Sequence, residues 1–329
     1  MAFVHSINYI SKHTLHTLVP CCFSTVMIKK YQPTLLFHSI FVAAVIVHPI
    51  LIFAASSISS DLFAINKHQL SRKLHINMAD QNQASPEKRW FPLESNPSLL
   101  NQYISKLGFD THMHGFTDVL STEQWALDMV PHPVSAVMVL FPMTEKVKNK
   151  RQQLHTNSLT EKSDAASSSV ENENGVWYIK QRIRNACGTI AVLHALANVP
   201  KSIQETCIRP SSWLDSFIQN CPASSSPTEK AIYLENDTTI ETYHEDATND
   251  GQTSRGTVDD DIDLHFISFV HVNGKLYELD GRVEQGPVCH GCTTQQDLLK
   301  DACGVVQQLM EADPSDMRFT ILAFAPAST

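Results

Sequence analysis

The sequence predicts a mixed α/β domain, because apolar runs of strand length alternate with segments whose apolar residues recur at helical spacing. Residues 136–141 form a continuous apolar run, which indicates a central strand. Two β-rich runs flank Asn273 and Gly274, a pair that favours the positive φ angles of a two-residue hairpin turn. These two signals, together with an apolar helix that follows residue 187, define the class.

The elements can be placed approximately along the chain. The apolar spacing predicts helices at about 96–107, from residue 187 onward, at 227–234 and at 298–310. Strands are expected at 136–141, 177–179, 265–272, 276–279 and 319–324. The segment between residues 234 and 263 is polar and poor in apolar anchors, so we expect a mobile surface loop there.

The strongest chemical signal is a cysteine at the start of an apolar helix. Asn185 is a good N-cap residue, and Ile190 and Leu193 recur at helical spacing, so Cys187 falls in the first turn. The helix dipole and the unpaired backbone N–H groups favour a thiolate there. Gln181 offers a side-chain N–H donor to a developing oxyanion, alongside the backbone N–H of the cysteine. The structural alternative is a buried core cysteine without chemistry.

A nucleophilic thiolate needs a base, and the nearest histidine in sequence is badly placed. His194 lies seven positions along the same helix, roughly 10 Å away at about 1.5 Å rise per residue, so we expect a packed or capping side chain. In the hairpin, the two-residue turn places Asp280 opposite Ile267. His265 and Asp280 are then diagonal neighbours on one face, where the carboxylate can orient the imidazole.

The same register produces a second diagonal pair, His271 with Glu278. Spacing alone does not choose between the two pairs. Because the second pair is nearer the turn, we expect it to be a solvated surface contact.

Three segments carry a family resemblance. Residues 181–195, 263–267 and 276–282 resemble the active-site blocks of the ubiquitin carboxyl-terminal hydrolases, a family of small papain-like deubiquitinases. Further similar segments lie at 89–97, 129–133 and 140–145, so the resemblance runs from about residue 88 to 325, in the order of the family and close to its spacing.

The resemblance implies roles for the matching positions. Cys187 would be the nucleophile, His265 the general base and later acid, Asp280 the group that orients the histidine, and Gln181 the oxyanion-hole donor. It also implies that His271 is not the base. The implied fold is papain-like, with helices on both sides of one antiparallel sheet and a knotted backbone.

The implied activity is hydrolysis of amide, ester or thioester bonds at the C-terminal glycine of ubiquitin. In the family a crossover loop over the active site limits the leaving group, and its modest length here predicts small or flexible adducts. The alternative is a ubiquitin-binding or stabilising protein in which hydrolysis is minor. A membrane receptor or channel is a further alternative, which only one apolar run supports. The sequence leaves open whether related modifiers are accepted.

Composition restricts the partners. A net charge of −9 over 329 residues argues against nucleic acid and suits a basic ligand such as the arginine-bearing tail of ubiquitin. Acidic residues gather ahead of His265, and the alternative is a solvated acidic loop. The members of this group are Glu241, Glu245, Asp246, Asp250, Asp259, Asp260, Asp261 and Asp263.

The cysteines indicate neither a disulfide framework nor a metal site. Eight are scattered along the chain, and we expect a cytoplasmic, monomeric enzyme without cofactor. Cys289 and Cys292 have the spacing of zinc ligands, but no second pair matches them. In the resembling family this segment is a plain turn.

Residues 1–77 form an N-terminal extension ahead of a catalytic domain at 78–329. Residues 34–55 are mostly apolar and long enough to span a bilayer, whereas Pro49 and two histidines weaken that interpretation. A cleaved signal peptide fits worse, because the apolar run begins late. The other interpretation is a dispensable extension, because Met78 resembles a natural start.

Overall fold

The computed structural model describes residues 88–163, 175–251 and 262–327. Contacts divide the chain into two units, Met1–Asn82 and Gln83–Thr329, and every described residue belongs to the second. The predictions for residues 1–77, including the apolar segment 34–55, therefore lie outside the described residues. Within the described ranges, no helix combines the length and apolar character needed to cross a membrane.

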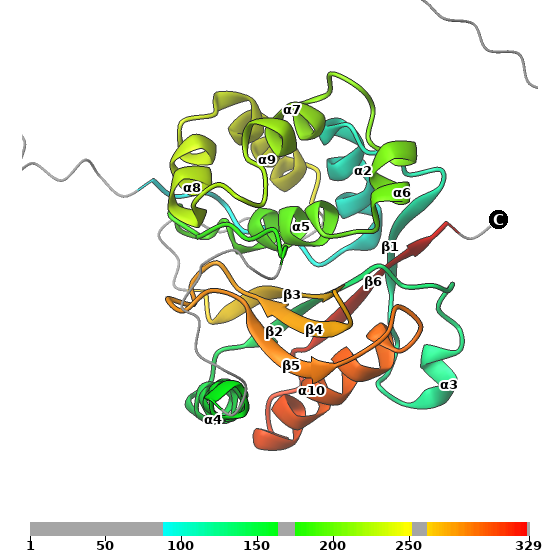
Figure 1. Cartoon of the computed structure of the whole chain (residues 1–329), viewed down its shortest axis with the longest axis vertical. Helices are drawn as coiled ribbons and strands as arrows, with labels where there is room; N and C mark the ends of the chain where they lie inside the picture. The colour runs from blue at the N-terminus through cyan, green and yellow to red at the C-terminus, as the bar shows by residue number, and fades with distance from the viewer. Residues whose placement is uncertain (1–87, 164–174, 252–261, 328–329) are drawn as a thin grey trace, which may run out of the picture. The chain divides into compact units, whose positions relative to one another are not determined.

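One antiparallel sheet forms the centre of the described unit, with its strands in the order β1-β6-β2-β3-β4-β5 (Figure 1). The central position predicted for residues 136–141 is confirmed, because β2 lies between β6 and β3. The strands are β1 (His114–Asp118), β2 (Ala136–Pro142), β3 (Leu264–Val272), β4 (Lys275–Leu279), β5 (Val288–Cys292) and β6 (Thr320–Pro326).

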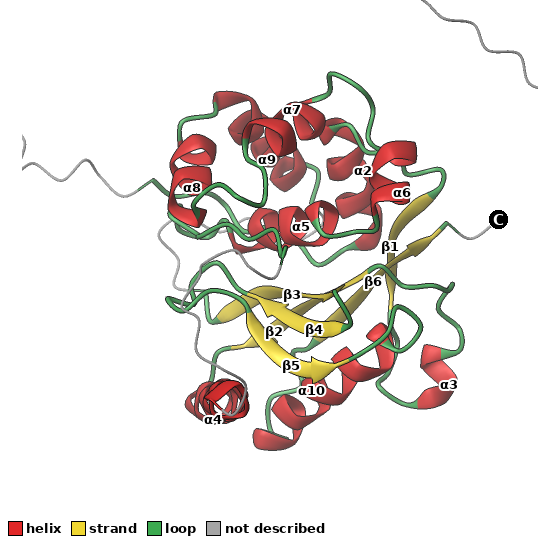
Figure 2. Ribbon diagram, viewed as in Figure 1, coloured by secondary structure: helices red, strands yellow, loops and turns green. Residues whose placement is uncertain are grey.

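Helices cover both faces of this sheet, as the resemblance implied (Figure 2). The helices on one side are α2 (Pro97–Leu107), α5 (Cys187–Ala197), α6 (Lys201–Cys207), α7 (Trp213–Asn220), α8 (Pro227–Glu235) and α9 (Thr238–Asn249). On the other side are α3 (Gln124–Leu127), α4 (Glu145–Ser163) and α10 (Leu298–Ala312). The knotted backbone stays a prediction.

Each face of the sheet contributes to its own hydrophobic core. Along β2, Met138 packs into the cluster on the α5 side, whereas Val137 and Val139 pack into the cluster on the α10 side. Successive strand residues point to opposite faces, so a strand covered on both sides needs apolar residues at every position. This explains the continuous apolar run in the sequence.

Most predicted elements are present with shifts of one or two residues at their ends. Asn96 caps α2 by accepting the backbone N–H groups of Ser98 and Leu99. Ser226 and Glu229 form a reciprocal capping box at the start of α8. Local capping chemistry therefore explains where these two helices begin.

Three expectations were wrong. Residues 177–179 form no strand, because Asn198 and His194 side chains bond the backbone of Trp177 and Ile179 instead. The segment expected to be a plain turn contains β5. Much of the expected loop between residues 234 and 263 is helix α9, which begins after a capping aspartate, Asp237.

The apolar pattern did not predict helix α9, because half of the residues on its buried face are polar. Its buried residues are Ile240, His244, Ala247 and Thr248. His244 is satisfied by Thr189 and by the carbonyl of Phe91, so it can lie in the core. Apolar spacing alone therefore understated the amphipathic character of the segment.

Candidate active site

Cys187 is the first residue of α5, as predicted, and the residue is 7% exposed. The predicted N-cap is wrong. Ala186 occupies the cap position without a side-chain hydrogen bond, and Asn185 has a φ of 63°. Asparagine tolerates this left-handed conformation better than most residues, so it serves the sharp entry into the helix. The thiol lies at the positive end of the helix dipole.

The hairpin positions an imidazole and a carboxylate together, in the predicted register. Ser268 lies opposite Leu279, and both Asn273 and Gly274 adopt positive φ in the turn. Asp280 directly follows β4, and its Oδ1 lies 2.9 Å from Nε2 of His265. Both side chains are almost completely buried, so the contact is shielded from water.

The thiol of Cys187 and the imidazole of His265 shift each other's pKa. Burial would raise the pKa of the Cys187 thiol, but the nearby imidazole of His265 and its charge outweigh this effect and lower the pKa below the ordinary value. The backbone of Phe266 and the charge of Arg282 act in the same direction. Burial would lower the pKa of His265, but the charge and hydrogen bond of Asp280, followed by Cys187, raise it. The pair therefore favours thiolate and imidazolium.

Gln181 lies against the turn that carries the carboxylate. Its backbone N–H donates to the carbonyl of Gly281 at 2.8 Å, and its side-chain Nε2 donates to the carbonyl of Ile183 at 3.0 Å. A Cβ at position 281 would lie only 2.7 Å from the Gln181 nitrogen, so the close approach requires glycine there. The Oε1 of Gln181 is buried without a hydrogen-bond partner among the described residues.

His194 is packed, as expected from its position along the helix. Its ring is fully buried, stacks on Tyr178, and uses Nε2 to bond the backbone of Ile179. Burial lowers the pKa of His194 to about 4, so it stays neutral near pH 7. It plays no part in the thiol geometry.

The alternative pair, His271 with Glu278, is not formed. His271 bonds Gln295 through Nδ1 and the backbone N–H of Gly274 through Nε2. Glu278 is 1% exposed, so the expected solvated contact was wrong. Its partners instead come from α4 and β5.

An arginine that the sequence did not single out connects Glu278 with Asp280. Arg151 on α4 bonds Oε1 of Glu278 through Nε at 2.7 Å and Nη2 at 2.5 Å, and the same Nη2 lies 2.7 Å from Oδ2 of Asp280. Burial would raise the pKa of Asp280, but His265 and then Arg151 outweigh it and hold this pKa well below its usual range. Arg151 lies in a polar segment, and only the folded arrangement reveals its partners.

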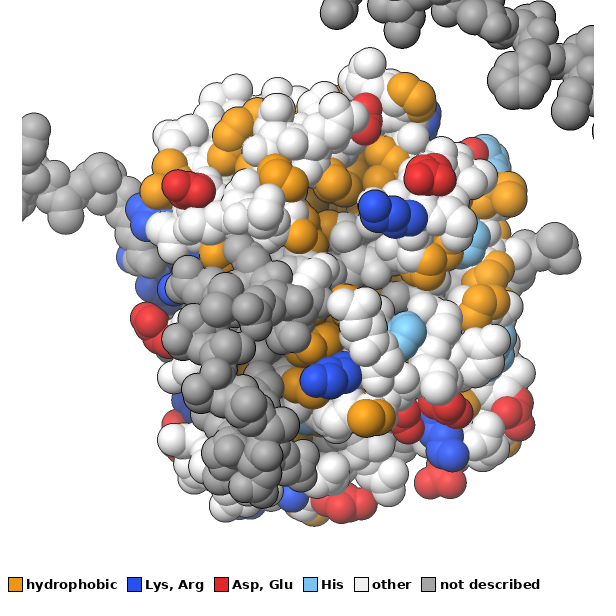
Figure 3. Space-filling view, viewed as in Figure 1, with side chains coloured by type: hydrophobic (Ala, Val, Ile, Leu, Met, Phe, Trp, Pro, Cys, Tyr) orange, Lys and Arg blue, Asp and Glu red, His pale blue; other side chains and the backbone are white. Residues whose placement is uncertain are grey.

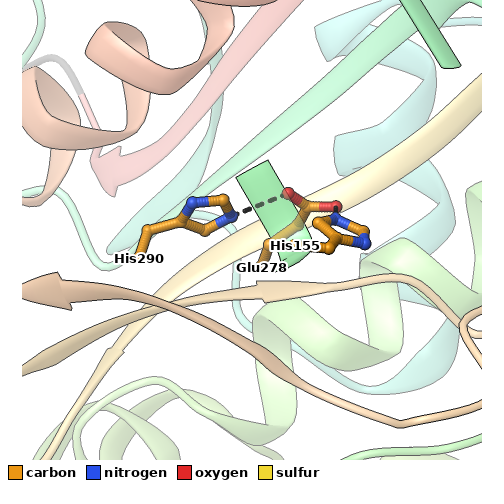
Figure 4. Close-up of side chains that lie close together, drawn as sticks. All are labelled: His155, Glu278 and His290. Carbon is orange, nitrogen blue, oxygen red and sulfur yellow. Dashed lines mark hydrogen bonds and ion pairs between the residues drawn. The ribbon is translucent and has the colours of Figure 1, made fainter. Parts of the chain in front are cut away.

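Three potential metal ligands also meet at Glu278. Figure 4 shows His155 and His290 on either side of its carboxylate, with Nε2 atoms 3.0 Å and 2.8 Å from its oxygens. Two imidazoles and a carboxylate could bind a transition metal. A cation here would lie next to the positive charge of Arg151 or displace it, which disfavours metal binding at this cluster.

The acidic residues ahead of His265 are partly engaged within the protein. Glu241 pairs with Lys88, Asp246 and Asp250 pair with Lys106, and Asp263 pairs with Arg318. Residues 259–261 lie outside the described residues. Over the described part of the face in Figure 3, acidic and basic side chains are interspersed, so this face carries no continuous basic patch of the kind that binds nucleic acid.

A buried thiol at a helix N-terminus, beside an imidazole that a carboxylate orients, is the arrangement of papain-like cysteine hydrolases. The fold and the site together define this class of protein.

Comparisons with known proteins give the family. Residues 90–311 match the family model of ubiquitin carboxyl-terminal hydrolase, family 1. The chain belongs to this family. Similar proteins include ubiquitin carboxyl-terminal hydrolase 3 of Arabidopsis thaliana, 38% identical over 75% of this chain and 99% of the relative. A probable ubiquitin carboxyl-terminal hydrolase of Dictyostelium discoideum is 36% identical over 74% and 90%.

Solved structures have the same fold. The UCH37 catalytic domain of Trichinella spiralis, crystallised bound to ubiquitin vinyl methyl ester, matches with a TM-score of 0.55 at 20% identity and covers 74% of this chain and 97% of that domain.

Proposed function

We propose that this protein is a cysteine-type deubiquitinase that hydrolyses amide, ester or thioester bonds at the C-terminal glycine of ubiquitin. The observation that carries the proposal is the buried contact of His265 with Asp280, together with the mutual pKa shifts of His265 and Cys187. Family membership supports the reaction, since the related proteins are ubiquitin carboxyl-terminal hydrolases.

The chemistry begins with the thiolate of Cys187 attacking the carbonyl carbon of the terminal glycine, which gives a tetrahedral oxyanion. His265, held as imidazolium, then donates its proton to the departing amine as the C–N bond breaks and a thioester forms. In the second half His265 accepts a proton from water, and the resulting hydroxide attacks the thioester. The C–S bond breaks, and the sulfur leaves as thiolate.

Asp280 keeps His265 in the productive orientation and stabilises its positive charge. The contact leaves Nδ1 of His265 without a nitrogen or oxygen partner among the described residues, so that nitrogen is available to the thiol and the substrate. The assignment of Asp280 rather than Glu278 is supported by the 2.9 Å contact.

The backbone N–H of Cys187 and the side chain of Gln181 would stabilise the oxyanion. In the structure one amide N–H of Gln181 donates to the carbonyl of Ile183, which fixes the side chain and leaves a second N–H on the same nitrogen. The contact with Gly281 ties this residue to the turn that carries Asp280.

Ubiquitin is the proposed partner because the UCH37 domains with the same fold carry ubiquitin vinyl methyl ester. We propose small or flexible adducts as the preferred substrates. Helix α9 ends at Asn249 and β3 begins at Leu264, so the connection between them, which corresponds to the crossover loop of the family, is shorter than the sequence suggested. A short connection limits the size of what can leave.

Turnover of a fluorogenic ubiquitin C-terminal amide tests the activity. Wild type should cleave it, and Cys187→Ser should bind ubiquitin without cleaving it. Tight binding without turnover by wild type would instead identify a ubiquitin-binding or stabilising protein. Comparing a ubiquitin–peptide fusion with a folded diubiquitin tests the adduct preference, and equal rates on the two would refute it.

We also propose a monomeric, cytoplasmic enzyme that does not bind nucleic acid. The six described cysteines are all free, which agrees with a reducing compartment. Light scattering after gel filtration would test the oligomeric state. Fractionation with an antibody against the catalytic unit would test a membrane anchor through residues 34–55, since a wholly soluble product excludes it.

A further inference from the structure

We propose that Arg151 is a positioning residue of the active site, which holds the carboxylate of Asp280 in the orientation that His265 requires. The inference rests on the proposed function for its catalytic readout, but its structural part can be tested without ubiquitin.

The Asp280 carboxylate is held at both oxygens. Its Oδ1 accepts Nε2–H of His265 and the backbone N–H of Arg282, each at 2.9 Å. Its Oδ2 accepts Nη2–H of Arg151 at 2.7 Å. Rotation of the carboxylate would break at least one of these bonds, so the three donors together fix the direction of Oδ1. Arg151 is the donor at Oδ2 that comes from outside the hairpin.

Arg151 is itself held firmly. Glu278 accepts two of its N–H groups on one oxygen, and the guanidinium carbon lies 5.6 Å from the ring centroid of Phe141. The Phe141 ring also lies against His265, with ring centroids 6.0 Å apart, and the two residues are opposite each other across β2 and β3. The guanidinium therefore has a fixed place relative to both Asp280 and His265.

His155 and His290 complete this arrangement from the far side. They direct Nε2 atoms at the Glu278 carboxylate from α4 and β5, so Glu278 cannot turn away from Arg151 without losing them (Figure 4). Neither histidine is hydrogen-bonded to Asp280 in these contacts. The experiment takes its control from the same helix, where the exposed Lys148 carries a positive charge and forms a surface pair with Glu145 at 2.8 Å.

Removing Arg151 would leave Oδ2 of Asp280 buried without its partner, which is unfavourable for an ionised carboxylate. The carboxylate could then rotate, and the Oδ1 contact with His265 would lose its fixed geometry. A displacement of about 1 Å in a catalytic contact can reduce a rate on the order of 100-fold. The effect should fall on kcat rather than KM, because no contact of Arg151 with substrate is involved.

The experiment compares Arg151→Met, Arg151→Lys and the control Lys148→Met, which removes an exposed positive charge from the same helix, in the full chain. We expect Arg151→Met to lower kcat for a ubiquitin C-terminal amide by about 10-fold to 100-fold with KM almost unchanged. Arg151→Lys should recover part of the loss because it keeps a charged donor, and Lys148→Met should stay close to wild type.

Two readouts separate positioning from a general structural role. The rate of Cys187 alkylation by iodoacetamide, followed by peptide mass across pH, should show the thiolate appearing at higher pH in Arg151→Met than in wild type. In an Asp280→Asn background the same substitution should have little further effect on kcat, because the two act through one contact.

Additive losses of Arg151→Met and Asp280→Asn, or an alkylation profile identical to wild type, would overturn the proposal. If Arg151→Met does not fold, the same cycle is run with Arg151→Lys, and additivity there is equally decisive. A shifted alkylation profile in a protein that cleaves no ubiquitin amide would refute the proposed function while supporting the positioning role.

Discussion

The two halves of the site are held by different means. Cys187 owes its position to α5, where the helix N-terminus and the backbone near Phe266 surround the thiol. The imidazole half depends on charges brought together from four elements, with Asp280 and Glu278 sharing Arg151. The first half is local in the sequence, whereas the second exists only in the folded protein.

This difference predicts which substitutions the site should tolerate. A helix terminus is a property of many backbone groups, so no single side chain supports it. A buried carboxylate depends on each donor, because one missing partner leaves an unsatisfied charge. The hairpin half should therefore be the more sensitive to substitutions that do not touch the reacting atoms.

The largest expected effect is on the thiol itself. Cys187→Ser should lower kcat by roughly 10⁵-fold or more, as for other nucleophiles of catalytic triads. Ubiquitin binding should remain, because the change is nearly isosteric. Single-turnover assays and calorimetry would measure the two quantities, with Cys292→Ser, an exposed cysteine, as the control. Substantial turnover by Cys187→Ser would show that another residue is the nucleophile.

In the hairpin half, Asp280→Asn should lower kcat on the order of 10⁴-fold, because an amide favours the wrong tautomer of His265 and cannot stabilise its charge. Steady-state kinetics on the fluorogenic amide would measure the loss. Asp263→Asn is a matched control, since Asp263 is an exposed partner of Arg318 just ahead of β3. A loss of only a few fold would assign Asp280 a structural role.

Sequence reasoning found the local half and the register but not the charge network. The cysteine, the hairpin and the diagonal placement of His265 and Asp280 follow from spacing. Arg151 could not be found, because no short pattern links residues more than 120 positions apart, and the polar segment that carries it has no apolar spacing to predict a buried side chain. The burial of Glu278 was missed for the same reason.

The oxyanion donor should show an intermediate effect. Gln181→Ala is expected to lower kcat by about 100-fold to 1000-fold while leaving the alkylation rate of Cys187 nearly unchanged, since the thiol pair does not depend on it. Gln181→Asn serves as the comparison, because it keeps an amide but shortens its reach. A parallel loss of thiol reactivity would show that Gln181 supports the site rather than the oxyanion.

The pH dependence compares the two halves directly. Because the pKa of Cys187 is lowered and that of His265 is raised, the ion pair exists above the first and below the second. The value of kcat/KM should fall about tenfold per pH unit outside this range. Asp280→Asn should move the alkaline limb to lower pH, because Asp280 raises the pKa of His265. An unmoved limb would contradict this link.

The smallest expected effect concerns the contact that joins the turn after β4 to Gln181. In Gly281→Ala the new Cβ would lie 2.7 Å from the Gln181 nitrogen and 2.9 Å from Cγ2 of Ile190, so the backbone must shift. We expect a loss of about 1–3 kcal/mol in the free energy of unfolding. The value of kcat should fall roughly tenfold, because Gln181 would be displaced by well under about 1 Å. Gly304→Ala, in open space on α10, is the control and should be stabilised by up to about 1 kcal/mol. Chemical denaturation and kinetics on both variants decide the matter, because equal stability of Gly281→Ala and wild type would mean that the turn yields without displacing Gln181.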